Sequence, residues 1–418
     1  MHLTSTTAAL LPTATCAGLI LFSLCGGACA ETGLPDWKFS GFGTAGVVHT
    51  NEKQADFAVS LLKGDGAGRT SAWSRHVDSR VGGQVDLTFN ARWSAVVQVV
   101  SEQRHDHSYQ PHIEWANVKY QATPELAVRL GRIALPMFIA ADYRKVGYAY
   151  PWVRMPLEVY GVQPISNSDG ADITWHWEGE NLRSTTQAFY GHTDMALYDG
   201  ARLRGTAIAG LSHTVEHGAL SARASVITTN LTVSLYREVF EALDGFGPPG
   251  RDIARRYIIA DKHATVASVG LNYDPGEWFV TAEAGRTKVN GFLGSTKSMY
   301  VSGGYRYDDL TPYAGFARVW GTPPAGAGAL SLADLPPAYA ATGALVNATL
   351  ASIVRAIQSQ STITAGLRWD LAPNMALKLQ HERITTPSGS RGMLINSVPD
   401  FVSGRTAQVS SAALDFVF

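Results

Sequence analysis

Segments in which apolar and polar side chains alternate recur along almost the whole chain, and they constrain the fold most. Val81, Val85 and Leu87, for example, alternate with Gln84 and Asp86. Successive side chains of a β-strand point to opposite faces, so this period of two indicates strands with one apolar and one polar face. We count about 16 such segments, each of roughly the ten-residue length that crosses an outer membrane when tilted.

The connections between these strands alternate in length. Short turns are expected at 90–92, 123–125, 178–181, 216–218, 274–277, 308–310 and 370–374. Long loops are expected at 51–74, 134–168, 231–262, 288–296, 321–360 and 385–405, with helical stretches near 236–243 and 338–357. This asymmetry is typical of an all-β transmembrane antiparallel β-barrel, which has short turns on one side and long loops on the other. An even number of strands puts both chain ends on the turn side.

Aromatic residues give an independent indication of a membrane barrel. Phe89, Trp93, Trp175 and Trp278 all lie beside short turns, where a barrel would gather them into a belt at one membrane interface. No apolar run long enough for a membrane-spanning helix follows residue 30, and only a closed barrel satisfies the backbone of strands in lipid. The alternative, a large soluble all-β protein, gives no reason for aromatics along one rim.

The chain ends in a strand that reads Leu414, Phe416 and Phe418 on one face and Asp415 on the other. It resembles the assembly signal of Gram-negative outer-membrane β-barrels, in which alternate hydrophobic residues end in Phe. The resemblance implies that this strand closes the barrel against the strand near Trp37, with Asp415 in the lumen, and that the barrel assembly machinery reads Phe418.

The first 30 residues contain no Lys, Arg, Asp or Glu and carry an apolar stretch, 17–25, before Ala28-Cys29-Ala30. This pattern predicts a signal peptide over residues 1–30 and a barrel domain over 31–418. Cys16, Cys25 and Cys29 all lie in this leader, so the mature chain would have no disulfide and no reactive thiol. A lipoprotein reading through Cys29 is the weaker alternative.

The charge balance and motifs exclude several classes of function. The chain has 34 basic and 35 acidic residues and a net charge of −1, so no basic field indicates nucleic-acid binding. Hydrolase and metalloprotease motifs are absent from the sequence, so no enzyme is predicted. The pair His105 and His107 belongs to a loop, where solvated histidines are common, and we assign no metal and no cofactor.

The segment 134–168 is rich in Pro and aromatic residues and is too apolar for a solvated external loop. It must pack against something, and the barrel lumen is the available place. Its start, Leu130-Gly131-Arg132 followed by Pro136, resembles the pattern with which Gram-negative porins begin the third external loop, after strand five. In that family this loop folds inward and narrows the pore. Met137-Phe138 departs from the pattern, because the Gly that often follows Pro-Phe in porins is absent.

The resemblance implies an outer-membrane porin: a water-filled channel for passive diffusion of small hydrophilic solutes, filtered by size and charge at the constriction loop 134–168. It further implies a homotrimer in contact with outer-membrane lipid and lipopolysaccharide. One alternative is a substrate-specific porin for phosphate, a sugar or an organic acid. Another is an outer-membrane enzyme or adhesin with an occluded barrel.

Charged residues of the loop and of the expected lumen faces are the candidates for the filter, since a transverse field sorts permeating ions by charge. The expected constriction residues are Arg129, Arg132, Asp142, Arg144, Lys145, Arg154, Glu158 and Asp169. The expected wall residues are Lys38, Arg80, Asp86, Glu102, Arg306, Arg318, Arg368 and Lys378. A register error of one residue moves any strand's charges to the other face.

Overall fold

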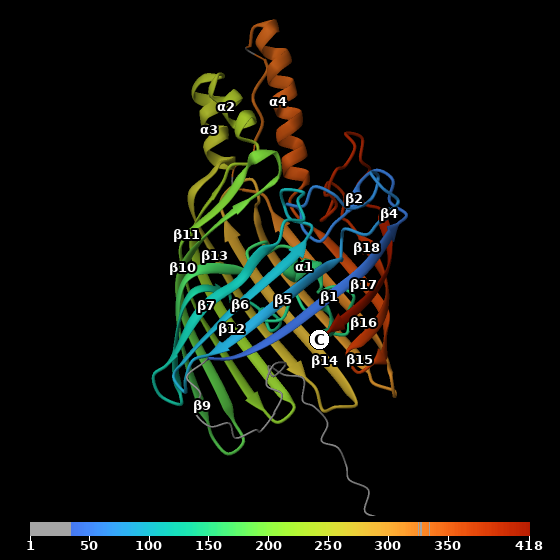
Figure 1. Ribbon diagram of the computed structural model, residues 1–418. Helices are drawn as coiled ribbons and strands as arrows, with labels where there is room; N and C mark the ends of the chain where they lie inside the picture. Colours follow the sequence, from blue (N-terminus) through green and yellow to red (C-terminus); the bar gives the residue numbers. More distant parts are fainter. Residues whose placement is uncertain (1–34, 325, 327, 334) are drawn as a thin grey trace, which may run out of the picture.

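The computed structural model describes residues 35–324, 326, 328–333 and 335–418. The expected leader, with its three cysteines, lies outside the described residues. Long antiparallel strands in chain order form a closed barrel, shown in Figure 1. They are β1 (Asp36–Thr50), β5 (Arg80–Thr88), β6 (Trp93–Glu102), β7 (His112–Gln121), β8 (Leu126–Ala134), β9 (Asn167–Glu178), β10 (Arg183–Ala196), β11 (Arg202–His217), β12 (Leu220–Val233), β13 (Ile259–Tyr273), β14 (Trp278–Val289), β15 (Ser295–Tyr305), β16 (Leu310–Thr322), β17 (Gln360–Ala372), β18 (Met375–Thr385) and β19 (Thr406–Val417).

The barrel closes where its first strand pairs with its last. β1 runs antiparallel to β19, with Thr44 opposite Asp415, and pairs on its other edge with β5. The final residue extends the seam, because Gly41 N–H donates to the Phe418 carbonyl at 2.9 Å and Phe418 N–H returns a bond at 3.0 Å. The 17-stranded sheet includes the two-residue strand β4 (Trp73–Ser74), so the described residues form a barrel of 16 long strands, as predicted.

Side chains alternate between the two faces of the wall, with polar side chains inside and apolar side chains outside, the reverse of a soluble protein. Interior positions hold buried polar groups such as Gln84, Gln98 and Gln380, whereas outward positions hold exposed apolar groups such as Ile173 and Leu130, which is 68% exposed. Several exposed aromatic residues lie near the short turns, among them Trp93, Trp175 and Trp278, and others, such as Trp73 and Trp320, lie at the opposite end of the barrel. The outer face is therefore suited to lipid and the inner face to water.

Helices and small strands are found in the long connections at one end of the barrel, which we call the loop end. Figure 1 shows α2 (Arg237–Asp244), α3 (Gly247–Tyr257) and α4 (Pro337–Arg355) rising there, and α2 and α4 lie close to the two expected helical stretches. The connection 51–79 carries β2 (Asp56–Phe57), β3 (Ala67–Gly68) and β4. No helix in the described parts of the chain is long and apolar enough to cross a membrane.

The connection between β8 and β9, residues 135–166, takes a different course, and we call it the inner segment. It contains one turn of 3-10 helix, η1 (Gly147–Ala149), and α1 (Leu157–Tyr160), which contacts β14, β15 and β16. The other 3-10 turn, η2 (Tyr198–Gly200), lies in the short loop between β10 and β11. The inner segment thus lies against strands on the far side of the barrel from those that it connects.

Gly131, near the end of β8 and four residues before the inner segment, has a backbone conformation that only glycine adopts easily. Its φ is +127°, and a Cβ atom there would lie 2.3 Å from the Ala116 carbonyl oxygen of the neighbouring strand. Only glycine adopts this conformation without strain, and it also permits the close approach of the backbone.

We expect Gly131→Ala to destabilise the barrel by about 1–3 kcal/mol, the usual range for a residue forced into such a conformation. Gly83→Ala is the matched control, since its added Cβ would meet its nearest atom at 3.5 Å, an ordinary contact. The measurement is the urea midpoint of unfolding in detergent micelles. Equal midpoints for the two variants would contradict this role of Gly131.

Candidate functional site

The inner segment packs its apolar side chains against the interior wall. Trp152 lies 6.1 Å from Tyr300 and 6.5 Å from Phe279, measured between ring centroids, and Phe138 lies 5.0 Å from Tyr160. All five residues are buried. The abundance of aromatic residues in this part of the sequence is explained by the contact, because one face of the segment is removed from water.

Lys378, on β18, holds the middle of the inner segment. The side chain is fully buried and its Nζ lies 2.7 Å from the Asp415 carboxylate of β19. The same ammonium group donates to the carbonyl oxygens of Gly147 at 2.7 Å, Tyr150 at 2.6 Å and Trp152 at 3.0 Å. A buried cation is tolerated when it is paired and hydrogen-bonded in this way. Lys378 is thus an anchor for the backbone rather than a charge exposed to the lumen.

Arg154 makes a second buried anchor. Its Nε and Nη2 donate to the two Asp78 oxygens at 2.9 and 2.7 Å, and its Nη1 pairs with Glu382 on β18. The Nη2 also donates to Ser411 Oγ on β19 at 2.5 Å. This one guanidinium therefore joins the inner segment to the connection 51–79 and to the last two strands. Asp78, which precedes β5, was not singled out in the sequence, where it reads as one more loop carboxylate.

The carboxylates of Glu158 and Glu283 fix the end of the inner segment. Glu158 is buried in α1 and accepts a hydrogen bond from Gln360 Nε2 at 2.7 Å. Glu283, on β14, accepts from the hydroxyl groups of Tyr160 at 2.5 Å and Tyr300 at 2.8 Å. The acid predicted at position 158 is therefore a structural acceptor in the dry contact between segment and wall.

Other charged groups of the inner segment keep part of their side chains exposed. The Asp142 side chain is 52% exposed although it faces the interior wall, where Arg223 Nη2 of β12 lies 3.7 Å away. Lys145 pairs with Glu102 on β6, and both side chains retain partial exposure. Arg144 donates from Nη2 to the Tyr160 carbonyl at 3.3 Å. Charges of both signs thus meet along this side of the segment.

The wall also carries further charged groups, and one of them, Arg368, donates to the Tyr148 carbonyl of the inner segment at 2.7 Å. Arg129 on β8 pairs with the buried Asp172 on β9 at 2.8 Å. Arg306 and Arg368 pair with Asp274 and Asp370, both at 2.7 Å. The predicted residues that face the interior are Lys38, Arg80, Asp86, Glu102, Arg129, Arg306, whose guanidinium lies over the buried Phe279 ring, Arg368 and Lys378.

Two predicted constriction residues were placed on the wrong face. Arg132 and Asp169 pair through two hydrogen bonds of 2.7 Å on the outward surface of β8 and β9. Asp169 has the same parity as Ala171 and Ile173, whose strand partners are also outward. The prediction relied on the charges of these two residues and not on the alternation of faces along their strands. Near the end of the barrel, two opposite charges that pair with one another do not need a water-filled lumen.

Arg318 is a further correction, because it is exposed on the outward face of β16 and does not line the wall. Its interior neighbours in the strand are the buried residues Ala317 and Val319. The guanidinium carbon lies 4.8 Å from the centre of the Trp320 ring, which is a favourable contact for a cation at the edge of an apolar surface.

The loops at the loop end hold buried titratable groups. Burial lowers the pKa of His105 to about 3, assisted by the nearby cations Lys63 and Lys145. Burial likewise lowers the pKa of Lys63 to about 8. Among the described residues, no group of three or more His, Cys, Asp or Glu side chains could hold a metal ion.

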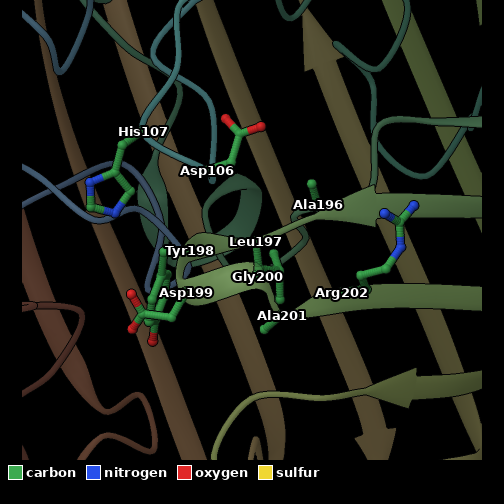
Figure 2. Close-up of a pocket in the computed structure, with 9 residues that line it drawn as sticks. All are labelled: Asp106, His107, Ala196, Leu197, Tyr198, Asp199, Gly200, Ala201 and Arg202. Carbon is green, nitrogen blue, oxygen red and sulfur yellow. The ribbon is translucent and has the colours of Figure 1, made fainter.

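A pocket of about 400 Å³ lies between the loop after β6 and the β10–β11 loop. Figure 2 shows Asp106 and His107 on one side of it and Tyr198 and Asp199 on the other. His107 also lies 3.5 Å from Asp65, through its Nδ1. The pocket belongs to the loops at the loop end and is separate from the charged groups around the inner segment.

We expect Lys378→Met to destabilise the barrel by about 3–5 kcal/mol, because it leaves Asp415 buried without its partner. The double variant Lys378→Met/Asp415→Asn should recover part of this loss, since no uncompensated charge remains. The temperature at which the barrel unfolds on a heat-modifiability gel measures both effects. Lys119→Met, at an interior lysine of β7 that belongs to none of the described ion pairs, is the control. A double variant that is less stable than the single variant would contradict the pairing.

The chain matches a protein family and resembles several solved barrels of the same architecture. A family model described as Gram-negative porin matches residues 13–388. No curated protein sequence matches the chain. The solved structures that resemble it share little sequence, so they show the fold alone.

Three of these structures illustrate the likeness. An anion-selective porin from Comamonas acidovorans is 12% identical, with a TM-score of 0.53 over 92% of this chain and 100% of that one. OmpF of Salmonella typhi, in complex with daunomycin, is 13% identical, with a TM-score of 0.52 over 91% and 97%. OmpT of Vibrio cholerae in its trimer form is 12% identical, with a TM-score of 0.50 over 92% and 100%.

Proposed function

The chain belongs to the Gram-negative porin family, and from that premise we propose that the inner segment and the wall facing it form the filter of its channel. Members of this family are outer-membrane β-barrels that act as channels and not as enzymes. The half-exposed Asp142 opposite the largely buried Arg223 carries the proposal, since Asp142 is a charge open to water in an interior otherwise narrowed by packed side chains.

The proposed filter has two parts with different roles. The groups beside solvent set the field through which solutes pass, and the buried groups hold the inner segment in place. The first part consists of Arg129, Asp142, Arg144 and Lys145, with Lys38, Arg80, Asp86, Glu102 and Arg306 along the wall. The second part consists of Arg154, Glu158, Lys378 and Arg368, the last of which donates to the Tyr148 carbonyl. Arg132, Asp169 and Arg318 are left out because they face outward. Small hydrophilic solutes would pass by size and charge, with no tight binding step.

We also propose how the chain is processed and what it assembles with. Residues 1–30 are a signal peptide that is removed before the barrel domain 31–418 folds. The Vibrio cholerae OmpT form that resembles this barrel is described as a trimer, which supports a homotrimer here. Outer-membrane lipid, lipopolysaccharide and the barrel assembly machinery are the expected partners. The last of these reads Leu414, Phe416 and Phe418, whose side chains point outward from β19.

Reconstitution of the protein in a planar bilayer tests the channel. We expect ohmic conductance in salt, and a barrel without conductance would refute the proposal. A current that saturates with one solute would instead favour a substrate-specific channel for phosphate, a sugar or an organic acid.

We expect Asp142→Arg to lower the cation-to-anion permeability ratio by about two- to fivefold, since a unit charge at 4 Å in water contributes about 1 kcal/mol and solvent screens part of it. The reversal potential in a potassium chloride gradient measures the ratio. Asp244→Arg, at the end of α2 above the barrel, is the matched control. Equal shifts in the two variants would contradict a local filter at Asp142.

The assembly signal is tested separately. Phe418→Ser should lower the fraction of protein that reaches the outer membrane as a folded barrel. It would also remove a ring contact with Phe39, whose centroid lies 5.9 Å away and which contributes about 0.5–1.5 kcal/mol. Tyr307→Ser removes an exposed aromatic beside a short turn but leaves the last strand intact. Folded fractions that fall equally in both variants would show that the terminal residue has no special role.

A further inference from the structure

Four cations gather on the outward surface of three neighbouring strands. They are Arg286 and Lys288 on β14, Lys297 on β15 and Arg318 on β16, and we call them the β14–β16 cationic patch. All four are exposed, whereas the alternate residues Thr296, Ser298 and Ala317 are buried on the interior side. The patch therefore belongs to the surface that faces the membrane.

The strand register brings the four side chains together. Arg286 is directly opposite Lys297, and Lys297 is directly opposite Trp320. Arg318 precedes Trp320 by two residues, so it lies diagonally from Lys297, within about 7–8 Å. Like charges this close repel one another, so the arrangement requires an anion or a highly polar environment.

The described residues supply no anion there. None of the four cations forms an ion pair within the described part of the chain. The other residues that share their outward parity on β14, β15 and β16 include no Asp or Glu. Outward arginines on β8 to β11 differ, since Arg132 pairs with Asp169 while Arg202 and Arg204 both pair with Asp194.

The height of the patch on the wall indicates its environment. Lys288 and Lys297 lie within two residues of the loop end of their strands. Trp278 and Tyr305 mark the opposite, turn end of β14 and β15, and apolar outward residues such as Val280 and Val301 lie between. A lipid-facing Lys or Arg costs about 2–4 kcal/mol at the midplane but only about 0–1 kcal/mol near the interface. The patch thus lies at the depth of the lipid headgroups on the loop side.

We propose that the β14–β16 cationic patch binds the phosphate groups of outer-leaflet lipid, the phosphorylated glycolipid of the Gram-negative outer membrane. The proposal rests on the outer-membrane location of the family and is independent of how solutes pass. Guanidinium and ammonium groups match phosphate oxygens as charge-assisted donors, and Trp320 is placed to contact the adjoining acyl chain. A second copy of the chain is a poorer occupant, because Asp169 and Asp194, the outward carboxylates of β9 and β10, are already paired.

The test uses the whole protein in nanodiscs of phosphatidylcholine with and without diphosphoryl lipid A. Native mass spectrometry measures the lipid A retained per barrel. We expect the variant Arg286→Gln/Lys288→Gln/Lys297→Gln/Arg318→Gln to lower the affinity for lipid A at least about tenfold, since several cations near the membrane surface add their attractions. Conductance should stay unchanged, which separates this result from a failure of the proposed filter.

The matched control is Arg132→Gln/Arg202→Gln/Arg204→Gln, which removes outward arginines that already have partners. It should retain native affinity, and a loss as large as that of the patch variant would overturn the proposal. Undiminished binding of lipid A by the patch variant would also overturn it, as would self-association of the native barrel that the variant abolishes. If the fourfold variant does not fold, the single variants Lys297→Gln and Arg318→Gln replace it. Each should then lower the affinity measurably, and native affinity in both would overturn the proposal.

Discussion

The pairing of β1 with β19 is the constraint on which the rest of the structure depends. Strands that face lipid must satisfy every backbone donor and acceptor within the sheet, and an open sheet would leave two edges without partners. Here the last residue, Phe418, still exchanges hydrogen bonds with Gly41. Closure separates an inside from an outside, and the register of each strand then decides which side chains face lipid and which face water.

The interior is governed by a second requirement, that buried charges be paired. Lys378 with Asp415, and Arg154 with Asp78 and Glu382, lie where the inner segment meets the wall. Charges farther from this contact, such as Asp142, retain solvent. Charged residues of the same types therefore have two different functions. The buried ones hold the segment in place, and the exposed ones face the solvent through which solutes would pass. On the outer face, the pairing of Arg132 with Asp169 contrasts with the unpaired cations on β14 to β16.

The sequence predicted the barrel well because alternation and turns are local signals. The strand count and the two helical stretches follow from neighbouring residues alone. The predicted faces of single charged residues were less reliable. Arg132, Asp169 and Arg318 were assigned to the lumen because they are charged, although the alternation along their strands puts them on the outer face. The anchoring roles of Lys378 and Arg154 could not be foreseen. They depend on contacts between residues more than 70 positions apart, and no periodic pattern encodes such contacts.

The inner segment belongs to the first half of the chain, yet Lys378, Glu382 and Ser411, which hold it at Gly147 and Arg154, lie on β18 and β19 at the end. These contacts cannot form while the last two strands are missing, whereas the contacts of Tyr160 with Glu283 on β14 and of Phe138 with Arg223 on β12 need only earlier strands. The strands that close the wall thus also complete the attachment of the segment that narrows the interior.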